Sequence, residues 1–437
     1  MFAVPLMITG ILQLLFNAAD TIVVGKFAGS ASLAAVGSTG SLINLLVNLF
    51  MGISTGTSVL VARYFGSRDR EALQKCVHTS MSLSVVLGVF VGIFGAVLAT
   101  PMLRLMDSDP EVLPLASLYL QIYFIGVPAS LVYNFGAAIL RSVGDTERPL
   151  KFLMISGVVN VLLNLLLVVV FHMGVAGVAI ATVVSQFLSA FLVVRCLMGS
   201  EGMYRLYLKR MRFHGGMLLK VIQVGIPAGL QSTVFSISNV TIQSAINSFG
   251  KVTMAANAAA SNIDGFIYIA MNAFYHAALS FMGQNIGAKR QERLGKVVVC
   301  CLGLVAGVGL IICPLVYLCG EHVLSLYISS TDADRDAVLA TAMVRLAYVG
   351  LPYVICGIME VNSGLLRGMG KAWMPLIISV LGACVFRIVW VNTVFAWKGT
   401  LPSLYVSYPV SWALTCLTQF VCLFFTYRGV KKRWSQA

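Results

Sequence analysis

The sequence predicts an all-α polytopic membrane protein with twelve transmembrane helices, arranged as two six-helix lobes that are related by a parallel internal repeat. Three observations lead to this fold class. Hydrophobic residues make up 59% of the 437 residues and charged residues only 11%, against about 25% charged in a typical soluble domain. The apolar residues fall into segments of membrane-spanning length, and the second half of the chain repeats motifs of the first half.

Twelve apolar segments can be counted, each long enough for a helix that crosses ~30 Å of hydrocarbon. They cover approximately residues 3–27, 33–62, 79–100, 115–138, 152–171, 175–198, 221–247, 255–282, 297–319, 342–365, 374–396 and 402–427. The expected domains are an N-lobe of residues 1–198 and a C-lobe of residues 221–437 with a basic cytoplasmic tail. Between them, residues 199–220 form a basic cytoplasmic linker in which aromatic and aliphatic side chains alternate with Arg and Lys, a composition suited to the headgroup surface.

The basic residues predict the orientation. Loops after the even-numbered segments, together with the C-terminal tail, hold 22 Lys and Arg residues, whereas loops after the odd-numbered segments hold five. Because cytoplasmic loops carry the positive excess, we expect a multi-pass protein of the cell membrane (inner or plasma membrane) with both termini in the cytoplasm. The net charge of +14 then reflects topology, and no nucleic-acid partner is expected.

Two further absences are expected from the pattern of residues. The first segment begins without a basic n-region or a cleavage motif, so no cleaved signal peptide is predicted. The ten cysteines lack metal-ligand spacing, and they are interpreted as small packing residues rather than as disulfide partners.

The chain is an internal duplication. SASLAAVGSTGS (30–41) aligns without gaps on KVTMAANAAASN (251–262), at an offset of 221 residues. The same register pairs ARYFGSRDREALQK (62–75) with GQNIGAKRQERLGK (283–296). Each repeat holds six segments, an even number, so both halves enter the membrane in the same direction. Parallel repeats about an axis along the membrane normal are typical of transporters, with substrate bound near the interface between the lobes.

The repeated motifs also resemble those of a known family. FNAADTIVVGKFAG (16–29), the LAAVG that follows it, GQNIGAKR, and the pair LRSVGDTERPL (140–150) and LRGMGKAWMPL (366–376) are similar to motifs of the multidrug and toxic compound extrusion (MATE) family. The resemblance covers essentially the whole chain. It implies a monomeric two-lobed antiporter that exports amphipathic, often cationic small molecules by alternating access. It implies no cofactor, and H⁺ or Na⁺ as the coupling ion.

Asp20 is the candidate cation-coupling residue of the N-lobe. A carboxylate inside a span costs ~2.5–3.5 kcal/mol on insertion scales, so it should face protein or a water-filled cavity. Asn160 and Asn164 are four residues apart and share one helix face, and Thr182 lies in a segment rich in small residues that allow close helix approach. These four positions match the MATE pattern of an N-lobe cation site, except that the pattern commonly has Asp where Asn164 stands. Interhelical hydrogen bonding without ion binding remains the alternative.

If the coupling ion is Na⁺, the resemblance makes Asp20, Asn160 and Asn164 its metal ligands. Carboxylate, amide and hydroxyl oxygens are hard ligands that can coordinate Na⁺. They can equally hydrogen-bond a protonated Asp20, so both ions remain open, with protons slightly favoured.

The C-lobe holds two acids within predicted spans, Asp264 and Glu360. Aromatic side chains accompany Asp264 in its segment, and carboxylates among aromatic and Met side chains suit organic cations. The predicted substrate-binding residues are therefore Asp264, Glu360, Phe266, Tyr268 and Tyr275. The alternative is structural, with one acid present to neutralise Arg387 in the middle of the eleventh segment.

Three other functions are conceivable for a membrane protein of this composition. A lipid-linked oligosaccharide flippase of the same superfamily is the alternative function, but such flippases usually have a strongly basic central cavity that this sequence does not supply. A membrane enzyme needs a nucleophile–base or metal constellation, and no such motif occurs, so no enzyme activity is expected. A structural or receptor-like membrane protein would not need buried acids in separate helices.

Overall fold

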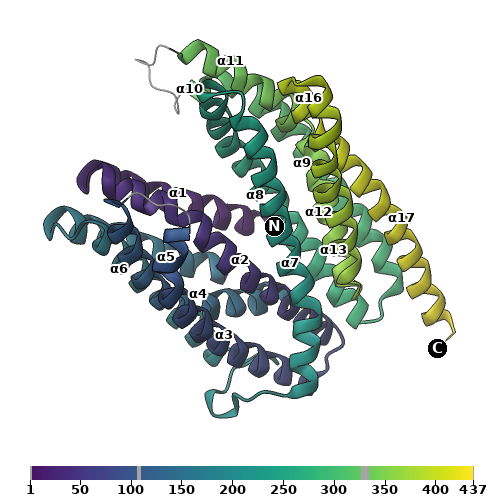
Figure 1. Cartoon of the computed structure of the whole chain (residues 1–437). Coiled ribbons are helices and arrows are strands. Elements are labelled where there is room, and N and C mark those ends of the chain that lie inside the picture. The colour runs from purple at the N-terminus through teal and green to yellow at the C-terminus, as the bar shows by residue number, and fades with distance from the viewer. Residues whose placement is uncertain (1, 106–109, 326–333, 437) are drawn as a thin grey trace. The chain divides into compact units, whose positions relative to one another are not determined.

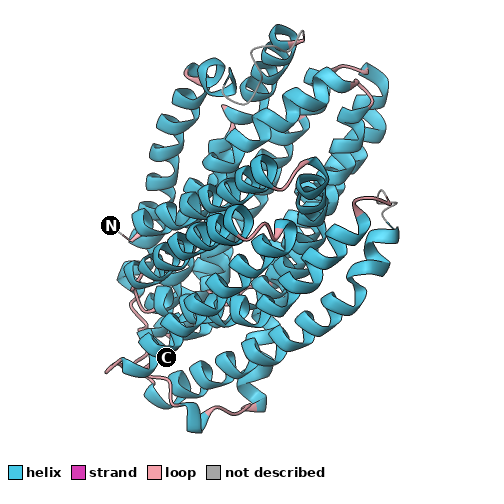
Figure 2. Ribbon diagram, turned by 90° about the vertical axis from the view of Figure 1, so that its left-hand side faces the viewer, coloured by secondary structure: helices cyan, strands magenta, loops and turns pink. Residues whose placement is uncertain are grey.

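A computed structural model describes residues 2–105, 110–325 and 334–436, and its regular structure in these ranges is helical throughout (Figures 1 and 2). The chain divides into two compact units, Met1–Gly229 and Leu230–Ala437. The division falls inside helix α7, so this single helix contributes its first half to the N-terminal unit and its second half to the C-terminal unit.

The N-terminal unit is built from six long helices, the connector after them and the start of α7. Its elements are α1 (Ala3–Phe27), α2 (Ser30–Gly66), α3 (Arg70–Leu105), α4 (Leu113–Ser142), α5 (Glu147–Asn164), the π-helical η1 (Leu165–Val170), α6 (Gly174–Gly199), the short η2 (Leu208–Arg210) and the first part of α7 (Gly215–Asn247).

The C-terminal unit has the same number of spans, but several of them are interrupted. Its elements after α7 are α8 (Lys251–Gly287), α9 (Gln291–Leu318), α10 (Gly320–Ser325), α11 (Arg335–Arg345), η3 (Leu346–Gly350), α12 (Tyr353–Gly368), α13 (Trp373–Ser379), η4 (Val380–Val385), α14 (Phe386–Trp390), η5 (Val391–Phe395), α15 (Ala396–Lys398), α16 (Leu401–Tyr405) and α17 (Ser407–Ser435). The elements η3, η4 and η5 are π-helical turns within otherwise continuous spans.

The described helices confirm the predicted fold class. Eleven helical spans are long and apolar enough to cross a membrane, and α2, with 37 residues, is the twelfth long helix. Each predicted segment lies within or closely over one of these spans. Several helices extend beyond their apolar segments because their ends carry polar residues, which the hydropathy of the sequence does not count as part of a span.

Backbone geometry repeats between the two units at the offset read from the sequence. Helices α2 and α8 both have 37 residues, and each follows a glycine in a left-handed conformation, Gly29 (φ 87°) and Gly250 (φ 89°). Directly after these helices, Arg68 (φ 56°) and Lys289 (φ 51°) also have positive φ. A positive φ is uncommon for a residue with a side chain, so its occurrence at two matched positions supports a true structural repeat.

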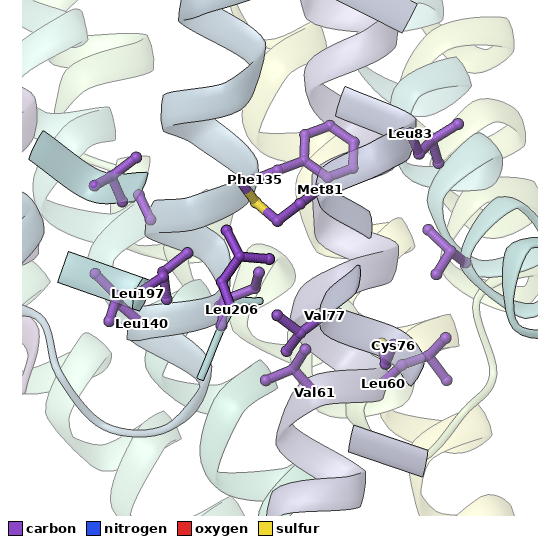
Figure 3. Packing of buried hydrophobic residues seen from close by; sticks show 14 of the residues in the cluster. Leu60, Val61, Cys76, Val77, Met81, Leu83, Phe135, Leu140, Leu197 and Leu206 are labelled. Carbon is purple, nitrogen blue, oxygen red and sulfur yellow. The ribbon is translucent and has the colours of Figure 1, made fainter. Parts of the chain in front are cut away.

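The core of the N-terminal unit is a cluster of buried apolar side chains at the centre of Figure 3. It joins α2, α3, α4 and α6, and it includes Leu206 from the connector between α6 and α7, which is 2% exposed. The side chains labelled in the figure are Leu60, Val61, Cys76, Val77, Met81, Leu83, Phe135, Leu140, Leu197 and Leu206. Because Leu206 is part of this core, the connector is packed into the unit rather than held only at its ends.

Hydrogen bonds from α3 fix the first part of this connector. The side chain of Gln74 donates from Nε2 to the backbone carbonyls of Met203, at 2.9 Å, and Arg205, at 3.1 Å. A single glutamine thus satisfies two carbonyls that no helix would otherwise bond.

Two histidines hold the second part of the connector. His78, 3% exposed, accepts the backbone N–H of Tyr207 at Nε2, over 3.1 Å. The backbone N–H of His214 donates to Thr79 Oγ1 at 3.3 Å, and its Nε2 accepts Arg212 Nε–H at 3.1 Å. Both imidazoles act as acceptors, which each ring can do only while that nitrogen is unprotonated.

Within the N-terminal unit, α2 and the start of α7 approach each other through a row of glycines, which we call the glycine seam. It consists of Gly52 and Gly56 on α2 and Gly225 and Gly229 on α7. A methyl group added at Gly52 would lie 2.2 Å from the Cα of Gly229, and one added at Gly56 would lie 2.2 Å from the carbonyl oxygen of Val221. The two backbones therefore touch, as small residues allow in membrane helix pairs.

Candidate functional site

The structure brings Asp20, Asn160 and Asn164 together in the N-terminal unit. Asn164 donates from Nδ2 to the Asp20 carboxylate and also, at 3.3 Å, to Asn160 Oδ1. Asn164 is fully buried and Asn160 nearly so, whereas Asp20 is half-buried. The helix face that carries Asn160 and Asn164, expected from their four-residue spacing, is therefore directed at Asp20.

Local packing explains why α1 and α5 meet at this point. A methyl group added at Gly157 would lie 1.9 Å from Phe16 Cε2, so the ring of Phe16 rests on the bare backbone of α5. Asp20 lies one turn after Phe16 on α1, and Asn164 lies two turns after Gly157 on α5. Asn164 is also the last α-helical residue before the π-helical η1, and such wide turns occur frequently at functional sites.

Thr182, the fourth predicted residue, takes another partner. Its hydroxyl donates to the carbonyl of Val178 on the same helix at 3.0 Å, and no bond to Asp20 is found among the described contacts. A residue that the sequence did not single out does interact with Asp20. The Tyr119 phenol, on α4, interacts electrostatically with Asp20 and is 7% exposed. From sequence alone a tyrosine in a span is not distinguishable from an ordinary packing residue.

The donor set of this site suits either a proton or Na⁺. Asp20 forms no ion pair with any described basic residue. Asn164 Oδ1 is buried without a hydrogen-bond partner among the described residues, so it can still accept one. An acid without a counter-ion, beside a free amide oxygen, can be neutralised by one monovalent cation.

In the C-terminal unit, Asp264 is paired with Arg345. Arg345 donates to Asp264 Oδ2 from Nη2 at 2.8 Å and from Nε at 3.1 Å, and it also donates to Asn257 Oδ1. Both ends of the pair are buried, with Asp264 5% and Arg345 7% exposed. Asp264 therefore has a protein cation as its partner, and that cation is not Arg387.

Glu360 has different surroundings. It is half-buried on α12 and interacts electrostatically with Arg367. Arg367 donates to Tyr275 Oη at 2.6 Å and to Gln231 Oε1 at 2.6 Å. Tyr268 interacts electrostatically with Glu360 and is 40% exposed. Glu360, Tyr268 and Tyr275 thus gather around one guanidinium group.

Phe266 is 37% exposed and has no described contact with either acid. The five predicted substrate-binding residues therefore separate into Asp264 with its buried ion pair, a Glu360–Tyr268–Tyr275 group, and Phe266 at an exposed position. All ten cysteines are free thiols. In the described ranges, no group of three or more His, Cys, Asp or Glu residues could hold a metal ion.

Twelve long helices, a parallel repeat and an acid-containing polar cluster inside a spanning unit define a polytopic membrane transporter. The sequence profile of the MatE family matches residues 5–166 and 227–392, one range in each repeat. The chain belongs to this family of multidrug and toxic compound extrusion transporters, as its motifs predicted. It is thus a multi-pass membrane protein of a transporter family, rather than a member of an enzyme family.

Individual relatives agree with this assignment. The chain is 28% identical over 399 residues to the "Probable multidrug resistance protein YpnP" of Bacillus subtilis (strain 168), covering 91% of this chain and 88% of that protein. It is 20% identical over 412 residues to the "Multidrug export protein MepA" of Staphylococcus aureus (strain MSSA476), covering 93% and 89%. A crystal structure of MATE in the bent conformation matches with a TM-score of 0.91 at 22% identity, over 99% of this chain and 95% of that one.

Proposed function

We propose that the protein is a cation-coupled antiporter that exports amphipathic, often cationic compounds, with Asp20 as the residue that binds and releases the coupling ion. The observation that carries this proposal is the bonding of Asp20. Its partner is the neutral amide of Asn164 rather than a described basic residue. A carboxylate that the protein leaves uncompensated inside a span is one that a cation from solution can neutralise.

Coupling follows from the energetics of two alternating states. A ligand shifts such an equilibrium only through its different affinity for the two states. Cation binding at Asp20 favours the state that has released its substrate outward. Each monovalent charge that moves inward down a 100 mV potential contributes ~2.3 kcal/mol. This free energy supports roughly fortyfold accumulation before any concentration gradient is added, since 1.4 kcal/mol corresponds to tenfold.

The coupling ion is H⁺ or Na⁺, and one ion binds in each cycle. Asp20 is the single acid within the predicted spans of the N-lobe, so one monovalent cation already neutralises it. If Na⁺ is the ion, Asp20, Asn160 and Asn164 supply its oxygen ligands. Both ions compete for the same carboxylate.

The substrate class is supported by the named relatives and by the Glu360 group. A half-buried carboxylate with Tyr268 and Tyr275 nearby offers charge and aromatic surface to an organic cation. We place the monomeric transporter in the cell membrane with both termini in the cytoplasm, surrounded by its lipids. The family match and the relatives' names do not favour the flippase alternative.

The test is transport of a fluorescent cation in proteoliposomes under an imposed proton or Na⁺ gradient. Asp20→Asn should abolish gradient-driven export while leaving equilibrium binding of the dye largely intact, because a neutral amide neither takes up a proton nor supplies the negative charge that Na⁺ would neutralise. The matched control is Asp69→Asn, an exposed acid whose role as acceptor for the Ala72 N–H an asparagine can keep. Full coupling in Asp20→Asn, or a cooperative dependence on two Na⁺ ions, would exclude this site.

A further inference from the structure

Arg387 is a buried cation in the middle of a span. It is 2% exposed and lies on α14, a single α-helical turn between the π-helical turns η4 and η5. Nε donates to Ser411 Oγ at 2.9 Å, and the guanidinium carbon lies 4.2 Å from the centroid of the Tyr408 ring and 5.6 Å from that of Trp412. Nη2 is buried and has no hydrogen-bond partner among the described residues.

The two acids within the spans of the C-terminal unit form no ion pair with Arg387. Asp264 is bonded to Arg345, and the charged neighbour of Glu360 is Arg367. No carboxylate in the described ranges forms an ion pair with Arg387. Arg387 is thus a buried guanidinium group without a carboxylate partner among the described residues.

No described residue neutralises this charge. Arginine stays protonated in proteins, and aromatic rings attract a cation without carrying a net charge. An isolated ion in a low-dielectric interior is strongly unfavourable unless it is paired. Arg387 therefore requires a negatively charged partner that the described residues do not supply.

Hydrogen bonds and close packing hold the groups around Arg387 in place. Ser411 donates its own hydroxyl proton to the Tyr408 carbonyl at 2.8 Å, so its oxygen is oriented to accept Nε–H. The backbone of η4 lies against α17, since a methyl group at Gly382 would be 2.3 Å from Thr415 Oγ1. Rings cover the guanidinium and Ser411 occupies Nε, which leaves the Nη edge for a ligand.

We propose that the Nη edge of Arg387 binds a monovalent anion, either a free inorganic ion or the carboxylate of a zwitterionic substrate. A guanidinium edge matches the geometry of a carboxylate, and its hydrogen bonds to an anion are stronger than those to a neutral acceptor. Because Nη2 is enclosed, the side chains that cover it must move when the anion enters. The proposal does not depend on the ion coupling at Asp20, which lies in the other unit.

Iodide quenching of tryptophan fluorescence tests the proposal on the purified full-length protein in lipid nanodiscs. Iodide is a monovalent anion, and binding at Arg387 would bring it close to Trp412. Sodium iodide is titrated against sodium isethionate, so that Na⁺ and ionic strength stay constant. We expect a saturable quenching component that disappears in both Arg387→Gln and Trp412→Phe. The control Arg290→Gln removes an exposed cation of the same unit and should retain the component.

Competition distinguishes the two sources of the anion. Displacement of iodide by chloride but not by acetate identifies a free inorganic ion, and displacement by acetate as well identifies a carboxylate site. Ser411→Ala keeps the guanidinium and frees Nε as a further donor, so half-saturation should occur at a severalfold lower iodide concentration even if Arg387→Gln does not fold. Saturable quenching that persists in Arg387→Gln, or its absence from the wild-type protein, would overturn the proposal.

Discussion

At the scale of single residues, the partner of a buried acid decides what that acid can do. Asn164 orients the Asp20 carboxylate but does not neutralise its negative charge. A cation from solution can therefore still bind there. Arg345 compensates the charge of Asp264 fully, and the pair is closed from solvent. Both acids lie in predicted spans, and from their different partners we propose a coupling role for Asp20 and a structural role for Asp264.

A double-mutant cycle on Asp264 and Arg345 measures that structural role. Arg345→Met should lower the melting temperature strongly, because removing one partner of a buried pair typically costs about 3–5 kcal/mol. The double variant Arg345→Met, Asp264→Leu should recover most of this loss, since it leaves no unpaired charge. Thermal unfolding in detergent is the measurement. A double variant that is no more stable than Arg345→Met would contradict the interpretation.

At the scale of elements, the connector between α6 and α7 is held in part by His214, whose imidazole accepts a hydrogen bond from Arg212. Burial lowers the pKa of His214 below its ordinary value of 6.5, and the positive charges of Arg212 and Lys75 add to the effect. A lowered pKa means that the docked connector binds fewer protons than a detached one. The docked form is therefore fully favoured above pH 6.5 and weakens as the pH falls through that value.

The lowered pKa of His214 predicts that the connector is less stably docked at low pH. Amide hydrogen exchange of residues 203–214, corrected for the intrinsic effect of pH on exchange, should show less protection at about pH 5.5 than at about pH 7.5. His214→Gln removes the titrating group, so the difference between the two pH values should shrink in that variant. Equal corrected protection at both pH values in the wild-type protein would show that the connector does not respond to protonation.

The glycine seam makes a second prediction at this scale. Gly52→Ala places a methyl group 2.2 Å from the Cα of Gly229, so α2 and α7 must separate. Such overpacking typically costs about 1–3 kcal/mol. Gly37→Ala, on the same helix, meets no atom within 4 Å and should be neutral or slightly stabilising, because alanine is the better helix former. Melting temperatures of the two variants provide the comparison, and equal values would argue against contact at the seam.

At the scale of the whole molecule, the repeat and the charge distribution predict one orientation. Ser67 and Ala288 follow α2 and α8 at matched positions of the repeat, and both are exposed. Cysteines introduced there in a cysteine-free background should react with a membrane-impermeant maleimide only from the cytoplasmic side. Labelling of one site from outside and the other from inside would contradict the parallel repeat. Labelling of both from outside would reverse the orientation.

The sequence predicts the fold well because each property that defines it is local. Hydropathy marks the spans, and the motif offset marks the repeat, which reappears as matched positive-φ positions at Arg68 and Lys289. The neighbours Asn160 and Asn164 are likewise visible from a four-residue spacing.

Partners far apart in the chain are not predictable in this way. Asp264 and Arg345 are separated by 81 residues, and the sequence suggests Arg387 instead as the basic residue that an acid would neutralise. Thr182 belongs to the expected set by its position, yet its hydroxyl bonds the preceding turn of its own helix. Such choices depend on helix rotation and register, which tertiary packing sets.

The glycine seam has a consequence for the gene. Every single-nucleotide missense change in a glycine codon introduces a side chain, and at Gly52, Gly56, Gly225 or Gly229 that side chain meets a neighbouring backbone. These four codons therefore have no conservative missense neighbour. In a saturation library selected for surface expression, we expect them to tolerate synonymous changes only, whereas the codon of Gly37 should accept alanine.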